Sequence, residues 1–224
     1  MGPGMSERKK RVGILISGRG SNMMSLIAAA RAPDYPAEIV CVLSNRPGAQ
    51  GLRAAEAEGV PARAIDHTRH ASREAFETEL NAALVEFDVD LVACAGFMRL
   101  MTPAFVEGWR DKMLNIHPSL LPAFKGLDTH ERAIAAGVKL TGCTVHIVRP
   151  EMDAGPIIAQ AAVPVLSADT AETLGARVLQ TEHKLYAHAL ALFAAGKLRI
   201  EGERVLGAPE QANLLEALVW PPIH

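Results

Sequence analysis

The chain has 224 residues, 49% of them hydrophobic, and a formal net charge of −2 at pH 7. A chain of this length and apolar content forms one large domain or two small ones with a packed core. The charge balance provides no basic surface for nucleic acid, and no apolar run reaches the ~18 residues that a membrane span requires, so we expect neither a nucleic-acid partner nor a membrane segment.

The two ends of the chain carry little structural patterning. Residues 1–10 are polar, and their basic residues are not followed by the apolar core of a signal peptide. We interpret 1–10 as a disordered tail whose first four residues look like an expression scar, and 201–224 as a C-terminal tail. The three cysteines (Cys41, Cys94 and Cys143) form no Cys-x-x-Cys pair, which predicts reduced thiols and a cytoplasmic location.

The first predicted strand, residues 12–17, leads into the glycine turn Ser17-Gly-Arg-Gly-Ser-Asn22, and a predicted helix over 22–31 follows. A strand, a tight glycine turn and a helix together present backbone N–H groups to an anion at the helix N-terminus. This layout favours a phosphate-bearing small molecule as the ligand. The alternative is a turn that serves packing only.

The glycine turn departs from two well-known nucleotide-binding patterns. It lacks the lysine of the P-loop, so nucleoside triphosphate hydrolysis is not expected. Met23 stands where the dinucleotide fingerprint has its third glycine. The predicted strand 38–44 is not followed by an acid that would hold a ribose 2′-hydroxyl. Both observations argue against an NAD-binding site. Arg46 is compatible with NADP, so an NADP-dependent reductase stays an alternative.

Predicted strands and helices alternate through the first part of the chain. Further strands are expected at 61–66, 90–96 and 112–117, and further helices at 49–59, 72–87 and 129–137. This alternation is typical of a mostly parallel, twisted sheet with helices on both faces, Rossmann-like in its N-terminal half.

The pattern changes after residue 140. Residues 141–148 and 157–165 are predicted to be antiparallel strands with no helix between them, and a long C-terminal helix is expected over 170–195. Asp169 and Glu172 are interpreted as the capping box of that helix. We therefore assign the chain to the α/β class.

Asn115 and His117 lie two residues apart in a predicted strand that stops at Pro118. The period of a strand places both side chains on one face, at the carboxyl end, where open α/β sheets bind ligands. An amide beside an imidazole can stabilise an oxyanion and move a proton, although such a pair can also be structural. Asp153, between the last two strands, is either an Asx-turn residue or a carboxylate that reaches the imidazole and favours its protonated form.

Two charged residues occupy positions that need an explanation. Glu182 falls on the apolar stripe of the long helix, so it either lies at the exposed edge of that stripe or holds a ligand. Arg73 lies in the first turn of its helix, where a cation opposes the helix dipole, and either an anionic ligand or solvation explains its position.

The histidines other than His117 give no clear site. His130 and His146 are compatible with a pocket or with ordinary packing, and the spacing of the other histidines predicts no metal site.

Five motifs follow one another in a specific order: Ser17–Asn22, Ala95–Arg99, Asn115–Pro122, Met152–Gly155 and Gln180–His183. Together, over residues 11–200, they resemble the phosphoribosylglycinamide formyltransferases, folate-dependent enzymes of purine synthesis. The Asn115–Pro122 segment is shared with other enzymes that use 10-formyltetrahydrofolate, whereas the glycine turn and Gln-Thr-Glu-His narrow the resemblance to this family. Ala154 and Asp128 depart from the family pattern, and no role is carried over to Asp128.

The resemblance implies a single formyltransferase domain over 11–200, with a nucleotide-phosphate half at 11–110 and a catalytic and folate half at 111–200. It implies formyl transfer from 10-formyltetrahydrofolate, a co-substrate, to the amine of 5-phosphoribosylglycinamide. Small molecules would be the partners, no metal would take part, and the protein would be a monomer or a homodimer.

The resemblance also implies roles for individual residues. Asn115 would donate to the oxyanion, protonated His117 would stabilise its charge, and Asp153 would keep His117 charged and oriented. The substrate phosphate would bind at Gly20, Ser21 and Asn22, and its ribose hydroxyls at Glu182. The folate site would comprise Arg73, Met98, Arg99, Leu100, Met101, Val148, Glu151 and Met152.

Other interpretations stay open at this point. Methionyl-tRNA formyltransferase shares the Pro-Ser-Leu-Leu-Pro segment but needs a further C-terminal domain, and formyltetrahydrofolate deformylase usually carries an extra N-terminal domain. We expect neither extra domain in this chain. The NADP-dependent reductase and a non-catalytic ligand-binding protein are the remaining alternatives.

Overall fold

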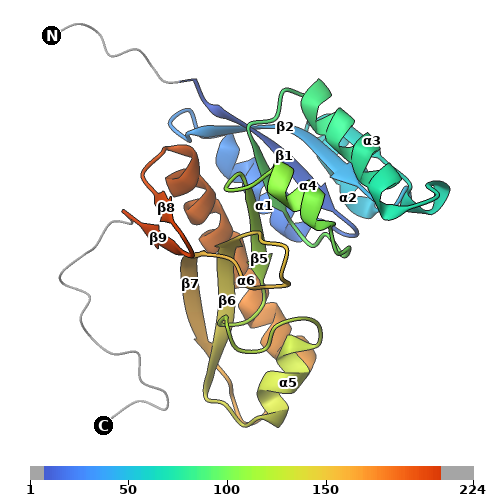
Figure 1. Ribbon diagram of the computed structural model, residues 1–224. Helices are drawn as coiled ribbons and strands as arrows, with labels where there is room; N and C mark the ends of the chain where they lie inside the picture. The colour runs from blue at the N-terminus through green and yellow to red at the C-terminus, as the bar shows by residue number, and fades with distance from the viewer. Residues whose placement is uncertain (1–7, 208–224) are drawn as a thin grey trace, which may run out of the picture.

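The computed structural model describes residues 8–207, which form one large sheet with helices packed on it and a small hairpin near the C-terminus (Figure 1). Of the two expected tails, residues 1–7 and 208–224 lie outside the described residues. Lys10 already belongs to the first strand, and the hairpin consists of β8 (Arg199–Glu201) and β9 (Arg204–Leu206). Secondary structure therefore extends into both segments that were expected to be tails.

The sheet has seven strands in the order β3-β2-β1-β4-β5-β6-β7. The first five strands pair in parallel, and β6 runs antiparallel to both β5 and β7. This confirms the predicted mostly parallel sheet with antiparallel strands toward the C-terminus. The strands are β1 (Lys10–Ile16), β2 (Ala37–Ser44), β3 (Ala62–Ala64), β4 (Leu91–Cys94), β5 (Met113–His117), β6 (Leu140–Ile147) and β7 (Ile157–Pro164).

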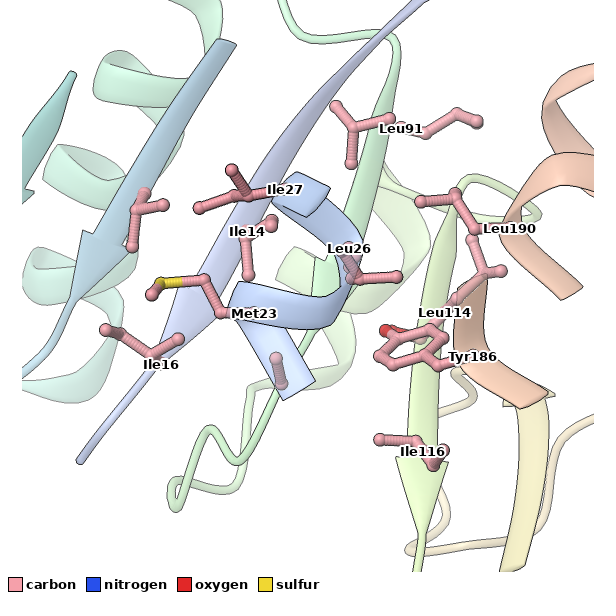
Figure 2. Close-up of a cluster of buried hydrophobic side chains, with 14 of the residues drawn as sticks. Ile14, Ile16, Met23, Leu26, Ile27, Leu91, Leu114, Ile116, Tyr186 and Leu190 are labelled. Carbon is pink, nitrogen blue, oxygen red and sulfur yellow. The ribbon is translucent and has the colours of Figure 1, made fainter. Parts of the chain in front are cut away.

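Helices cover both faces of the sheet, as predicted. Because alternate strand residues point to opposite faces, Ile14 and Ile16 of β1 belong to a core cluster with residues of α1, α2 and α6. Leu15 belongs to a second cluster, with residues of α3 and α4. Figure 2 shows the first of these clusters, where Tyr186 of α6 lies beside Leu114 of β5. The helices are α1 (Ser21–Ala30), α2 (Gln50–Ala57), α3 (Arg73–Glu86), α4 (Pro103–Gly108), α5 (Thr129–Ala135) and α6 (Ala171–Ala194), with a 3₁₀ turn, η1 (His67–Arg69). No helix of residues 8–207 is long and apolar enough to cross a membrane.

Two local features differ from the sequence-based expectations. Helix α4 was not predicted; it begins at Pro103 behind Thr102, whose hydroxyl accepts a hydrogen bond from the N–H of Phe105. The predicted capping box of α6 is wrong, because Thr170 and Thr173 form it. Asp169 instead binds Arg177.

Candidate active site

A cavity of about 820 Å³ opens at the carboxyl ends of β4 and β5, where the sheet changes from parallel to antiparallel. Its walls come from the segment after β4, the end of β5, the start of α5 and the β6–β7 loop. Most of the predicted catalytic and folate-binding residues line it: Asn115, His117, Asp153, Met98, Arg99, Leu100, Met101, Val148, Glu151 and Met152. The fold thus brings together side chains that are far apart in the sequence.

His117 and Asp153 face each other in this cavity. The Nδ1 of His117 lies 3.5 Å from Oδ2 of Asp153, and its Nε2 lies 3.0 Å from the carbonyl oxygen of Phe124. An oxygen acceptor therefore faces each ring nitrogen, which suits a doubly protonated ring. Asp153 has a left-handed backbone with φ 51°, and its Oδ2 accepts a hydrogen bond from the N–H of Gly126 at 2.8 Å. The carboxylate reaches the imidazole and a second loop, so it is more than a local turn residue.

Asn115 lies beside His146, whose role the sequence left open. The two residues are cross-strand partners in β5 and β6, and the amide nitrogen of Asn115 is 3.2 Å from Nε2 of His146. The Nδ1 of His146 lies 3.0 Å from the carbonyl oxygen of Ile147, so in the neutral ring Nδ1 carries the proton and Nε2 accepts. Burial lowers the pKa of His146, which keeps the ring neutral. One N–H of the Asn115 amide is thereby oriented, and its second N–H stays available.

The glycine turn lies between β1 and α1. Gly20 precedes α1 with φ 77°, a left-handed conformation that glycine adopts without steric cost. Ser21 and Asn22 are the first two residues of the helix, so their backbone N–H groups are among those that lack helical partners. These three residues do not line the large cavity.

Glu182 is buried, at 7% exposure, rather than at the exposed edge of α6. Its Oε2 accepts a hydrogen bond from Nδ2 of Asn22 at 2.6 Å, which joins the middle of α6 to the start of α1. Burial raises the pKa of Glu182, and the Asn22 hydrogen bond and the nearby His117 oppose this rise. The Oδ1 of Asn22 is buried without a hydrogen-bond partner among the described residues. This pair therefore has an unused acceptor close to the glycine turn.

Exposed apolar side chains surround the large cavity. Met98, Leu100, Leu127 and Met152 are each more than half exposed and all line it. Such a cluster beside a concave site is typical of a surface that binds an apolar ligand. Arg73, by contrast, is an exposed residue at the start of α3 and is not among the cavity-lining residues.

The described residues contain no group of three or more His, Cys, Asp or Glu side chains arranged to hold a metal ion. The three cysteine thiols are buried and unpaired with one another, and burial raises the pKa of Cys94, which lines the cavity, to about 12. Thiolate chemistry at this residue is therefore disfavoured near neutral pH.

The fold and the cavity are typical of α/β proteins that bind small molecules at the carboxyl edge of the sheet. The sequence profile of the formyl transferase family matches residues 10–190, and the chain belongs to that family.

Individual relatives agree with this assignment. The chain is 40% identical over 209 residues to the phosphoribosylglycinamide formyltransferase of Escherichia coli (strain K12), covering 93% of this chain and 95% of that protein. It is 51% identical over 193 residues to the trifunctional purine biosynthetic protein adenosine-3 of Bos taurus, covering 86% of this chain but only 19% of that longer protein. The crystal structure of glycinamide ribonucleotide transformylase 1 from Symbiobacterium toebii superposes with a TM-score of 0.88 at 44% identity, over 92% of this chain and 97% of that one.

Proposed function

We propose that this chain transfers the formyl group of 10-formyltetrahydrofolate to the amine of 5-phosphoribosylglycinamide. The observation that carries the proposal is the convergence of Asn115, His117 and Asp153 on one cavity. The relatives named phosphoribosylglycinamide formyltransferase support formyl transfer to this ribonucleotide. The choice of 10-formyltetrahydrofolate as the donor rests on the resemblance of the sequence motifs. The cavity volume of about 820 Å³ lies in the usual range for a small-molecule site, about 300–1,000 Å³.

In the proposed mechanism, the neutral amine of the ribonucleotide attacks the formyl carbon. The carbonyl oxygen becomes an oxyanion, which receives a hydrogen bond from the free N–H of the Asn115 amide and is stabilised by the charge of His117. Asp153, 3.5 Å from His117, orients the ring and faces its charge. When the intermediate collapses, the bond to N10 of the folate breaks, and the proton lost by the attacking amine balances the proton gained by N10. The reaction needs no covalent enzyme intermediate, because both reactants are held together.

The two substrates are proposed to occupy adjoining regions. The folate would fill the large cavity, against Met98, Arg99, Leu100, Met101, Val148, Glu151 and Met152. The phosphate would bind the N–H groups of Gly20, Ser21 and Asn22, and Glu182 would accept hydrogen bonds from the ribose hydroxyls. The role of Arg73 at the folate stays a prediction, since the folate would have to extend out of the cavity to reach it.

The broader expectations also stay predictions. These are a single formyltransferase domain over 11–200 with its two halves, a cytoplasmic location, and a monomer or homodimer that takes only small molecules as partners. This chain matches only 19% of the longer trifunctional relative of Bos taurus. Activities of the rest of that protein are therefore not assigned to this chain.

One assay distinguishes the candidate functions. The purified chain is mixed with 5-phosphoribosylglycinamide and 10-formyltetrahydrofolate, the folate chromophore is followed, and the formylated product is detected by mass. We expect product only when both substrates are present. Loss of the formyl group without the ribonucleotide would indicate hydrolysis, oxidation of added NADPH would indicate a reductase, and binding without turnover would indicate a non-catalytic protein. Any of these three results in place of formyl transfer would overturn the proposal.

A further inference from the structure

Arg149 is a buried cation at the base of the β6–β7 loop. The residue is 7% exposed and follows Val148 directly. Its Nη2 lies 2.7 Å from Oδ1 of Asp111, and its Nε lies 3.4 Å from Oε1 of Glu203. Because an unpaired buried charge is costly, these two carboxylates are what allow a guanidinium at this position.

The two carboxylates come from segments that are distant in the sequence. Asp111 lies in the turn between α4 and β5, and Glu203 lies in the turn of the β8–β9 hairpin. That hairpin falls beyond residues 10–190, the segment that matches the family profile. Arg149 thus links the β6–β7 loop, a wall of the cavity, to a hairpin outside the matched segment.

The rest of the loop base is held by the backbone. The N–H of Val148 donates to the carbonyl of Met113 at 2.8 Å, and the N–H of Ile147 donates to that of Pro156 at 2.9 Å. The stem of Arg149 crosses the other end of the loop, since a Cβ on Gly155 would lie 3.1 Å from its Cγ. The arginine therefore contacts both ends of the loop at once.

The tip of the same loop has little support of its own. Glu151 and Met152 are exposed. Outside its own loop, Asp153 accepts one hydrogen bond, from the N–H of Gly126, and otherwise faces only the rings of His117 at 3.5 Å and His146 at 4.0 Å. The position of the tip over the cavity consequently depends on how firmly the base is held.

We propose that Arg149 is a positioning residue, whose ion pairs with Asp111 and Glu203 hold the β6–β7 loop so that Asp153 and Met152 stay at the cavity. The inference rests on the proposed function for its kinetic consequences. It makes the β8–β9 hairpin a support of the folate side of the site. Arg149 is among the residues that line the cavity, but its guanidinium nitrogens face the two carboxylates and the Val148 carbonyl, so we assign its effect to the loop.

The kinetic test replaces Arg149 by Met, which keeps the apolar stem over Gly155 and removes the charge. A displacement of ~1 Å near reacting groups can cost as much as about 10²-fold in rate, so we expect kcat to fall about tenfold or more. The KM for 10-formyltetrahydrofolate should rise as well, because Met152 would no longer be held against the folate. The KM for the ribonucleotide should not change. Arg149→Lys, which keeps the charge, should recover part of the loss. The matched control is Arg199→Met, which removes an exposed arginine of the same hairpin whose ion pair is to Glu201, and it should behave as wild type.

A second measurement does not depend on turnover. Amide hydrogen exchange of residues 150–154 should be faster in Arg149→Met than in wild type, with no change in α1. If Arg149→Met fails to fold, the variants Asp111→Asn and Glu203→Gln, which alter the more exposed partners, should show the same faster exchange. A folded variant with wild-type exchange and wild-type folate KM would overturn the positioning role. Absence of formyl transfer in the wild-type chain would overturn the proposed function instead, and the exchange data would still decide the role of Arg149.

Discussion

The amide nitrogen of Asn22 donates a hydrogen bond of 2.6 Å to the carboxylate of Glu182, across 160 residues of sequence. Asn22 belongs to the glycine turn and Glu182 to the middle of α6, so this one contact joins the two motifs that were assigned to the ribonucleotide. Burial raises the pKa of Glu182 above 4.5, which means that the fold holds an acid in a place where its charge is disfavoured. A residue of this kind typically trades stability for ligand binding.

Replacing Glu182 by Gln should weaken ribonucleotide binding and stabilise the fold. Gln can still accept from Asn22, but hydrogen bonds to a charged group contribute about 1.5–3 kcal/mol, so we expect the ribonucleotide KM to rise about tenfold or more. The folded wild type holds this proton more tightly than the unfolded chain, so its stability falls as pH rises from 4.5 through the raised pKa. Glu182→Gln has no carboxyl group at this position, so its stability does not fall over this pH range.

Thermal unfolding between pH 4 and pH 8 tests the stability half of this prediction. The melting temperatures of wild type and Glu182→Gln should converge at the acid end and diverge at neutral pH, by roughly 2–4 °C for each kcal/mol in a chain of this size. Glu172→Gln, an exposed substitution near the start of the same helix, should leave both the melting temperature and the KM unchanged. A variant that melts below wild type at pH 7 would refute the argument from burial.

The sequence predicted the strand ends well, because a strand end depends on local signals. Pro118 stops the strand that carries Asn115 and His117, and period two places both side chains on one face. The pairing of Asn115 with His146 was not predictable, since the register between β5 and β6 is set by the whole sheet. The same holds for Glu182, whose burial depends on α1 packing against α6.

Short elements and exact helix starts were also beyond the sequence. Helix α4 has six residues, too few for a helical period to be recognised. The start of α6 offers Asp169 and Thr170 in succession, and either residue type caps helices, so the pattern could not choose between them. Arg149 was not singled out, because nothing in its surroundings along the chain indicates that Asp111 and Glu203 meet it.

Removing the amide of Asn115 should slow the chemical step. Loss of one oxyanion donor costs on the order of 10²–10³ in rate, so we expect Asn115→Ala to lose that much in kcat with little change in either KM. Single-turnover measurements with both substrates saturating would isolate this step. Asn81→Ala is the control: this asparagine binds the Trp109 indole N–H in another part of the fold. An unchanged kcat in Asn115→Ala would exclude the oxyanion role.

Replacing Asp153 by Asn separates its charge from its hydrogen bond. The amide oxygen of Asn can still accept from the N–H of Gly126, so the loop contact is kept, while the negative charge 3.5 Å from His117 disappears. We expect kcat to fall about 10²–10⁴-fold, the range for loss of acid–base function, and His117→Ala to fall in the same range. The double variant should be no slower than the slower single variant, since the two residues act as a unit. Additive losses would show that they act independently.

Asp169 should make α6 sensitive to acid. Its carboxylate is 4% exposed, pairs with both terminal nitrogens of Arg177 at 2.7 and 2.8 Å, and also accepts from Leu166 and Thr173. Arg177 lowers the pKa of Asp169 well below 3.8, so its stabilisation is present above pH 3.8 and is lost as pH falls through the folded-state pKa. Asp169→Asn should therefore lower the melting temperature at pH 7 by several degrees, at roughly 2–4 °C per kcal/mol. Circular dichroism melts from pH 7 to pH 2 should show that the difference in melting temperature between Asp169→Asn and wild type becomes smaller as the pH falls. The control Asp34→Asn, at an exposed position, should melt at the wild-type temperature throughout. A difference that stays constant with pH would contradict the ion-pair explanation.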